Sequence, residues 1–350
     1  MKSNPGHFFE DFRLGQIITH ATPRTLTAAD AALNIALTGS RYALFCADTF
    51  AGQCGFQRAP IDPLLAFHVV FGKTVPDISL NAVANLGYAE GRFLAPVFVG
   101  DTLSARSEVI GLKQNSNRQT GVVHVRTEGR NQHGEAVLSY VRWVMVKKRD
   151  EEAAVQDAPA PSFAAALAAR DLAIPAGLSF SRYDFAGAGS PHAFEDYAVG
   201  EKIAHVDGVT IEEAEHQLAT RLYQNTARVH FDAFEQRNSR FGKRLIYGGV
   251  AISLARALAF NGLSNAALML AINGGRHVAP LFAGDTLYAW SEVLDKAEIG
   301  APEQKLGALR LRLVAMKNRH DTPFPDRQPD GSYDEPVVLD FDYWAAIPRR

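Results

Sequence analysis

A polar loop in the second half of the chain carries residue types that can bind water and move protons. Gln224–Asp232 reads QNTARVHFD and contains Asn225, His230 and Asp232. A histidine titrates near neutral pH, so His230 can take a proton from water and return it. The carboxamide of Asn225 can position water but cannot exchange protons at neutral pH, whereas the nearby acids Asp232 and Glu235 can. Asp232 could equally be the N-cap of a helix.

Two glycines follow this loop at the start of an apolar segment. Tyr247, Gly248 and Gly249 lead into Gly249–Phe260, which reads GVAISLARALAF and has almost no polar face. The pattern predicts a buried helix. Free backbone N–H groups at a helix start, with no side chain in the way, suit an oxygen that develops negative charge. The alternative is that the glycines only allow tight packing.

The chain contains one domain twice. Ala95–Val109 (APVFVGDTLSARSEV) and Ala279–Val293 (APLFAGDTLYAWSEV) are identical at 11 of 15 positions, with an offset of 184 residues. Phe9–His20 and Phe194–His205 agree at six of twelve positions, with an offset of 185. The near-constant offset indicates a duplication. We expect an N-terminal domain at 1–148, a linker at 149–190 and a C-terminal domain at 191–350.

Both copies predict the same order of elements. A short strand and a helix (Ala28–Leu37 and Ile211–Leu222) come before an irregular loop and a longer apolar helix (Pro63–Val75 and Gly249–Phe260). Several β-branched stretches follow, at Thr120–Glu128, Ala136–Val146, Ala308–Met316 and Pro336–Ile347. This order is typical of an α+β domain in which an antiparallel sheet wraps around a central helix. Two such sheets can pair edge to edge. In the linker, Ser162–Leu172 could form a short helix.

Several repeated residues are expected to be structural. Glycine and aspartate favour turns, so Gly100-Asp101-Thr102 and Gly284-Asp285-Thr286 predict turns before a strand. His20 and His205 lie at equivalent strand ends and predict a structural hydrogen bond. His68, in the first apolar helix, is expected to be a core histidine.

Composition narrows the function classes. The 350 residues suffice for two cores, and 47% hydrophobic with 21% charged residues is ordinary for a globular protein. A net charge of −2 argues against a nucleic-acid partner. Cys46 and Cys54 offer no disulfide framework, and no histidines, cysteines and acids have metal spacing. No signal-peptide core or membrane span is visible, so a cytoplasmic protein is expected.

Two stretches carry a family resemblance. Arg92–Thr102 (RFLAPVFVGDT) and Arg276–Thr286 (RHVAPLFAGDT) resemble the strand signature of MaoC-like hydratases, the (R)-specific enoyl-CoA hydratase or hydratase-2 group. Because both copies carry it, the resemblance covers nearly the whole chain and implies a tandem (double) hot-dog fold. HFFEDFRLGQIITHATPRT and LYQNTARVHFDAF are similar to the family members that act on mesaconyl-CoA. The implied activity is a hydro-lyase that interconverts mesaconyl-CoA and β-methylmalyl-CoA, with CoA as part of the substrate and no other cofactor.

The resemblance implies roles for the loop residues. The family's catalytic loop follows G-D-x-N-P-x-H-x-D, which places His230 on the histidine that activates water and Asp232 on the last acid. Asn225 falls where the family has its catalytic aspartate, so Asn225 would orient the water, and His230, Asp232 or Glu235 would handle the proton. The family's helix-start glycine, which supplies an amide to the thioester oxygen, matches Gly249. Gly248 replaces the family's histidine and would support it.

The same comparison implies that the first copy is inactive. Anchored on Asp48, the register places Arg41 and Cys46 where the second copy has its asparagine and histidine. At the helix start the first copy has Asp62-Pro63-Leu64, and the proline removes one N–H. The first copy would contribute only the cavity for the substrate.

Further basic residues are implied for the substrate. Arg237, Arg240, Lys243 and Arg244 could hold the CoA phosphates, or could form a solvated basic face. Arg228, followed by Arg221, is the best-placed cation for the second carboxylate of mesaconyl-CoA.

Three alternatives remain open from the sequence. The first is a hydratase for another enoyl-CoA, such as a straight-chain one. The second is a hot-dog thioesterase that attacks the thioester carbonyl. The third is an acyl-thioester binding module without activity, which the missing aspartate suggests. No membrane partner is expected, and two chains could form a homodimer.

Overall fold

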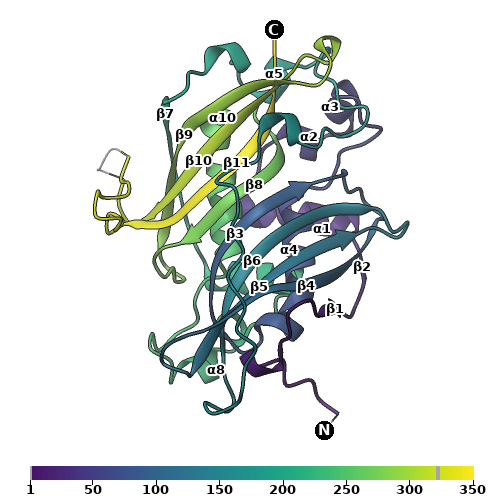
Figure 1. Cartoon of the computed structure of the whole chain (residues 1–350). Coiled ribbons are helices and arrows are strands. Elements are labelled where there is room, and N and C mark those ends of the chain that lie inside the picture. The colour runs from purple at the N-terminus through teal and green to yellow at the C-terminus, as the bar shows by residue number, and fades with distance from the viewer. Residues whose placement is uncertain (1, 321–323) are drawn as a thin grey trace.

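The computed structural model describes residues 2–320 and 324–350, within which eleven strands form one antiparallel sheet (Figure 1). The strands of the first half are β1 (Ile17–Thr19), β2 (Arg24–Thr25), β3 (Ala82–Phe93), β4 (Thr102–Gln114), β5 (Thr120–Arg130) and β6 (Ala136–Lys147). Those of the second half are β7 (Lys202–Thr210), β8 (Leu268–His277), β9 (Thr286–Ile299), β10 (Leu306–Lys317) and β11 (Val337–Pro348). The strand order is β1-β4-β5-β6-β3-β8-β11-β10-β9-β7, with β2 beside β4.

The helices repeat in the same order in both halves. The first half has α1 (Ala28–Thr38), α2 (Ala43–Cys46), α3 (Asp48–Gln53) and α4 (Pro63–Thr74), which continues into the π-helical turn η2 (Val75–Ser79). The second half has α6 (Glu213–Leu222), α7 (Arg228–Phe231), α8 (Ala233–Gln236), α9 (Gly248–Leu258) and α10 (Phe260–Leu263). The region between the halves contains α5 (Phe185–Ala188). Short 3-10 turns are η1 (Phe9–Asp11), η3 (Ala169–Asp171), η4 (Phe194–Asp196) and η5 (Pro302–Gln304).

The predicted α+β architecture is confirmed, with each half an antiparallel sheet around an apolar helix, α4 or α9. The helices and strands predicted within the two halves are present with ends shifted by no more than two residues. The predicted edge-to-edge pairing is also confirmed, because β3 and β8 lie side by side with Tyr88 opposite Gly275 and Arg92 opposite Ala271 (Figure 1). No described helix has the length and apolar character needed to cross a membrane.

The helix suggested at Ser162–Leu172 is wrong, apart from the short turn η3. This segment forms hydrogen bonds with the sheet instead of helical hydrogen bonds within itself. The Leu167 N–H donates to Asn273 Oδ1 at 2.9 Å, and Trp344 Nε1 donates to the Leu167 carbonyl at 3.0 Å. Phe163 stacks on Trp143 with ring centroids 6.0 Å apart. These tertiary contacts outweigh the helix propensity of the alanines.

The repeated turns and histidines have the predicted structural roles. Gly100 and Gly284 adopt φ values of 101° and 92°, which favour glycine. The carboxylates of Asp101 and Asp285 accept the N–H of the residue three positions earlier, at 2.7 and 2.9 Å. In the same way, Nε2 of His20 and of His205 each lies 2.8 Å from a buried serine hydroxyl, at Ser107 and Ser291.

The two central helices meet at equivalent positions. His68 of α4 and Ser253 of α9 are 185 residues apart, the offset of the duplication, and His68 Nε2 lies 2.9 Å from Ser253 Oγ. Both side chains are buried, and residues of both helices belong to one apolar core. His68 is therefore the core histidine that the sequence predicted.

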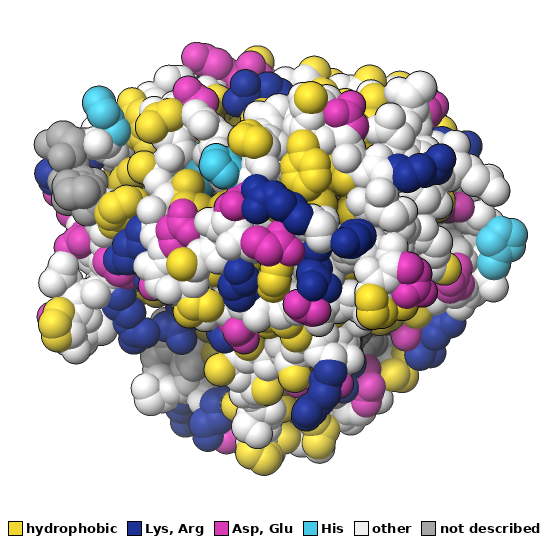
Figure 2. Space-filling model, turned by 90° about the horizontal axis from the view of Figure 1, so that it is seen from above, with side chains coloured by type: hydrophobic (Ala, Val, Ile, Leu, Met, Phe, Trp, Pro, Cys, Tyr) yellow, Lys and Arg dark blue, Asp and Glu magenta, His cyan; other side chains and the backbone are white. Residues whose placement is uncertain are grey.

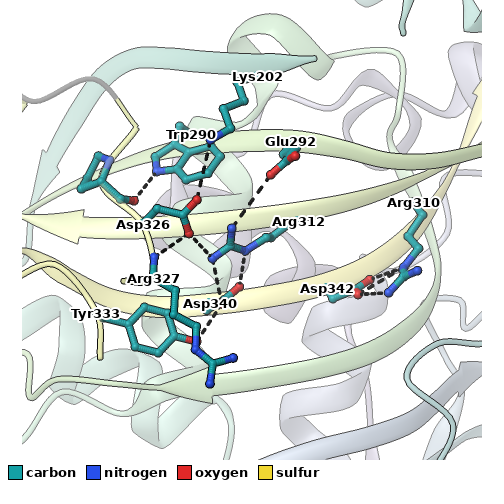
Figure 3. A network of polar contacts seen from close by, with 11 residues as sticks. Lys202, Trp290, Glu292, Arg310, Arg312, Asp326, Arg327, Tyr333, Asp340 and Asp342 are labelled. Atoms are coloured by element: carbon teal, nitrogen blue, oxygen red, sulfur yellow. Dashed lines mark hydrogen bonds and ion pairs between the residues drawn. The ribbon is translucent and has the colours of Figure 1, made fainter. Parts of the chain in front are cut away.

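The segment 324–336, before β11, is held to strands of the second half by charged groups (Figure 3). Arg312 of β10 donates through Nε and Nη2 to the carboxylate of Asp340 at 2.9 and 3.0 Å, and its Nη2 lies 2.6 Å from Asp326 of the loop. Trp290 Nε1 donates to the Pro325 carbonyl at 3.1 Å. Elsewhere on the surface, charges of both signs are interspersed, as the face in Figure 2 shows.

The His68–Ser253 contact yields a first prediction. Ser253→Ala leaves a buried imidazole nitrogen without its partner, so the free energy of unfolding should fall by about 1–3 kcal/mol in urea denaturation. Ser116→Ala, at an exposed position, is the control and should change it by less than about 0.5 kcal/mol. Equal stability of the two variants would show that the contact contributes nothing.

The buried histidines predict a loss of stability in acid. Burial lowers the pKa of His68 to about 3 and of His205 to about 4, below the value of about 6.5 in an unfolded chain. The stability that they contribute is complete above pH 6.5. It is lost as the pH falls toward 4, by up to about 1.4 kcal/mol per pH unit for each histidine. Denaturation between pH 7.5 and 5 measures this slope, which should be shallower in His205→Gln but not in His133→Gln, at an exposed site.

Candidate active site

The N-terminus of α9 leaves backbone donors open. The N–H of its N-cap residue, Tyr247, donates to His216 Nε2 at 2.9 Å. Among the described residues nothing accepts from the N–H of Gly248 or of Gly249. Two adjacent donors at a helix start, with the positive end of the helix dipole behind them, can bind an oxygen that carries negative charge.

The equivalent end of α4 is closed. Asp62 occupies the position of Tyr247, and its Oδ1 accepts the N–H of Leu64 at 2.8 Å. Pro63 has no N–H to offer. The predicted difference between the two helix starts is therefore present, and the capping carboxylate of Asp62 is a second cause that the sequence analysis did not name.

Both glycines are also needed for packing. A Cβ on Gly248 would lie 2.4 Å from the His277 ring, and one on Gly249 would lie 2.6 Å from Cε1 of His68. The same Cβ on Gly249 would lie 2.4 Å from Cε1 of Tyr247. The two interpretations of the glycines are therefore compatible. Because these residues have no side chain, the rings of His277, His68 and Tyr247 can pack close to the open amides.

His230, on α7, lies beside Tyr247 at the start of α9. Its Nδ1 lies 3.0 Å from the carbonyl oxygen of Leu245, and its ring centroid lies 5.5 Å from that of Tyr247. Since a carbonyl only accepts, Nδ1 carries the hydrogen and the lone pair remains on Nε2. Burial lowers the pKa of His230 to about 4, so that the imidazole is neutral at pH 7.

Two further histidines border the same helix end, and the sequence analysis did not find them. The ring of His216 lies 6.3 Å from that of His230. His277 packs on Gly248, and its Nε2 has no hydrogen-bond partner among the described residues. Burial lowers the pKa of His216 to about 3 and of His277 to about 4, and the neighbouring His230 contributes in both cases.

A signal for these two histidines exists in the repeat. His277 falls in RHVAP, where the first copy has Phe93 in RFLAP. His216 stands opposite Ala31 at the offset of 185. This difference between the copies is the signal by which the sequence could have pointed to these two histidines.

The predicted Asn225 and Asp232 contact their own loop. Asn225 is buried, and its Oδ1 accepts the N–H of Ala227 at 3.1 Å. Asp232 is exposed and caps α8 by accepting the N–H of Glu235 at 3.0 Å. Within the described residues no carboxylate forms a hydrogen bond or ion pair with His230. The role of Asn225 in orienting water stays a prediction.

The register of the first copy is shifted by one residue from the predicted one. Gly39 and Gln224 both adopt positive φ, 66° and 54°, at the end of equivalent helices. Ser40 therefore corresponds to Asn225, and Phe45 corresponds to His230. Anchoring the alignment on Asp48 wrongly gave Arg41 and Cys46. Asp48 is the first residue of α3, whereas Asp232 is the N-cap that precedes α8, so the two acids differ by one position. The first copy still lacks the histidine.

The predicted phosphate-binding residues separate into two groups. Arg237, Arg240 and Lys243 are exposed and lie over the rings of Phe234, Phe241 and Phe282, at 5.4, 5.3 and 4.2 Å from the ring centroids. Arg244 is largely buried, and its Nη2 lies 2.6 Å from Glu213 of α6. Only the first three are free to meet an anion from solvent.

The two arginines predicted to bind a substrate carboxylate are not among the buried side chains at the start of α9. Arg228 is exposed, with its Nε 3.9 Å from a Glu235 oxygen. Arg221 is exposed and lines a cavity of about 400 Å³ between the two halves. The other lining residues are Asn4, Ala21, Thr22, Gly72, Lys73, Pro76, Asp77, Thr220, Gln224, Thr226 and Phe231.

Comparison with known proteins agrees with this geometry. The family model described as mesaconyl-CoA hydratase matches residues 2–327. The chain is 63% identical to a mesaconyl-CoA hydratase of Cereibacter sphaeroides, over all of both chains. It is 59% identical to a β-methylmalyl-CoA dehydratase of Chloroflexus aurantiacus, over 100% of this chain and 99% of that one.

Solved structures support the same assignment. A putative MaoC domain dehydratase from Chloroflexus aurantiacus superposes with a TM-score of 0.97 at 59% identity, over 100% and 99% of the two chains. A Mycobacterium tuberculosis protein described as a double hotdog fold gives 0.77 at 28% identity, over 97% and 98%. The tandem hot-dog fold is thereby confirmed, and the chain belongs to the mesaconyl-CoA hydratase family.

Proposed function

We propose that this protein is a hydro-lyase that reversibly adds water to the double bond of mesaconyl-CoA and forms β-methylmalyl-CoA, without a cofactor beyond the CoA of the substrate. The observation that carries the proposal is the open N-terminus of α9, with two free amide donors beside His230. Membership of the family and the names of the two full-length relatives give the substrate.

The geometry supports a proton-transfer mechanism. Water gives a proton to Nε2 of His230 while its oxygen bonds to the β-carbon. The electron pair of the double bond moves to the thioester oxygen, where the N–H groups of Gly248 and Gly249 donate. His230 then returns the proton to the α-carbon, which restores the neutral imidazole and completes the addition of water.

The low pKa of His230 is compatible with this role. In the free protein burial favours the neutral, proton-accepting form. Negative charge that develops on the thioester oxygen stabilises the imidazolium, so the base gains its proton only as the enolate forms. His277 lies next to Gly248, and its Nε2 has no partner in the described part of the chain. It is the second imidazole at this helix end and would hold the attacking water.

The surface around α8 supports a CoA ester. The cavity of about 400 Å³ is lined by Thr226 and Phe231 of the loop that carries His230, so it lies next to that loop. Arg237, Arg240 and Lys243 lie in the next stretch of chain, with Phe234 76% exposed beside them. Exposed cations and an aromatic face suit a phosphorylated adenine nucleotide.

The test follows the absorbance of the conjugated enoyl thioester with mesaconyl-CoA. We expect the wild-type protein to consume the band, His230→Ala to lower kcat by roughly 10²–10⁴-fold, and His277→Ala to lower kcat with little change in KM. His133→Ala, at an exposed site, is the control.

The outcomes separate the alternatives. Consumption of crotonyl-CoA but not of mesaconyl-CoA would keep the mechanism and overturn the substrate. Release of free CoA thiol from saturated acyl-CoA would indicate a thioesterase. Binding without turnover would indicate a binding module.

A second prediction concerns the CoA moiety. Replacing Arg237, Arg240 and Lys243 together by glutamine should raise KM for mesaconyl-CoA about tenfold and leave kcat unchanged, since the removed charges act on binding alone. The KM for the mesaconyl thioester of pantetheine, which lacks the nucleotide, should not change. The same charge removal at Lys113, Arg118 and Arg126, on β4, β5 and their connection, is the control. Equal KM changes in the two triple variants would contradict the assignment.

A further inference from the structure

Arg142 of β6 is a fully buried arginine in the interior of the first half. Its exposed fraction is 0%. It pairs across the sheet with Tyr88 of β3, and its guanidinium carbon lies 4.3 Å from the ring centroid of Phe71 on α4. It is thus enclosed between the sheet and the central helix.

The guanidinium uses only part of its hydrogen-bonding capacity. Nη2 donates to the hydroxyl oxygens of Thr74 and Ser79 at 2.8 and 3.3 Å. Nε and Nη1 have no hydrogen-bond partner within residues 2–320 and 324–350. No described carboxylate forms an ion pair with it. A buried charge without a counter-ion costs several kcal/mol, a cost that an anion bound beside the guanidinium would offset.

The second half also contains a buried arginine, Arg256, with which Arg142 can be compared. Arg256 of α9 is also buried, but its Nη2 donates to the backbone carbonyls of Ala266 and Ala267, the latter at 3.1 Å. At the offset of 185 residues Arg256 replaces Phe71. Tyr343 pairs with Ile272 of β8 as Arg142 pairs with Tyr88 of β3, so Tyr343 occupies the position of Arg142. The copies have exchanged the cation and the aromatic ring between helix and strand. Among the described residues Arg142 leaves both Nε and Nη1 without a partner and donates only to hydroxyl groups, whereas Arg256 leaves Nη1 without one and donates to two backbone carbonyls.

Arg142 lies behind the rings that border the start of α9. The Phe71 ring centroid is 5.6 Å from that of Tyr247, which is 5.5 Å from that of His230. On the other side, Tyr88 is 6.0 Å from His277 by the same measure. Contacts from His230 to Tyr247, from Tyr247 to Phe71 and from Phe71 to Arg142 therefore connect the start of α9 to the guanidinium.

We propose that Arg142 binds the distal carboxylate of a dicarboxylic enoyl thioester whose carbonyl oxygen is held by Gly248 and Gly249. A carboxylate accepting from Nη1 or Nε supplies the missing counter-ion, and the aromatic rings shield the pair from water. This inference rests on the proposed function and assigns to Arg142 the role that the sequence analysis gave to Arg228 and Arg221.

The first test uses the wild-type protein and two saturated esters that cannot be hydrated. Succinyl-CoA and butyryl-CoA have the same number of acyl carbons and differ in the distal carboxylate. As competitive inhibitors of mesaconyl-CoA hydration, succinyl-CoA should bind at least about tenfold more tightly. Equal inhibition constants would overturn the inference without any variant.

The second test uses two matched variants. Arg142→Met should lower kcat/KM for mesaconyl-CoA by about 100-fold and reduce the preference for succinyl-CoA over butyryl-CoA to near one. Arg256→Met removes the other buried arginine and should leave that preference as in the wild type. If Arg142→Met does not fold, Arg142→Lys, which keeps the charge but loses the fork of donors, should weaken the preference.

The outcomes distinguish this inference from the proposed function. A wild-type protein that does not hydrate mesaconyl-CoA refutes the function. A wild-type protein that hydrates it, with Arg142→Met lowering activity on mesaconyl-CoA and crotonyl-CoA equally, refutes only the role of Arg142.

Discussion

The pairing of β3 with β8 is the constraint on which the rest of the molecule depends. It joins two sheets into one and brings α4 and α9 into a common core, where His68 meets Ser253. It also places Tyr88 of the first half against His277 of the second. The candidate site is therefore built from both copies, although its open helix end and its three histidines come from one.

The equivalent helices α4 and α9 begin with different residues. In the first copy, Asp62 and Pro63 leave little unsatisfied, and burial raises the pKa of that carboxyl to about 6. In the second copy, the amides of Gly248 and Gly249 have no acceptor among the described residues, which costs stability. Unsatisfied hydrogen-bond donors of this kind are expected at functional sites, where a fold departs from local rules of stability. The chain retains a well-capped version of the same element in its other half.

Much of the fold was predictable because the chain repeats itself. The Gly-Asp-Thr turns and the pair His20 and His205 recur at a constant offset, and recurrence separates structural residues from chance. The short helix expected near Leu167 failed because contacts with Asn273 and Trp344 decide that segment, and such contacts are invisible in a local pattern. His230 could be found from its loop. His277 could not be found by periodicity, since a histidine at a strand end resembles a packing residue until Phe93 is set beside it.

The exchange of Arg142 and Phe71 for Tyr343 and Arg256 has a consequence for symmetry. In a dimer of identical hot-dog subunits every substitution appears twice, so the two walls around a shared helix pair cannot diverge. Fusion into one chain removes that restriction, because each half accumulates changes independently. An identical pair would have two equivalent helix starts, whereas the described residues of this chain have one open start, at α9, and one capped start, at α4. The two ends of an unsymmetrical molecule can then meet different side chains.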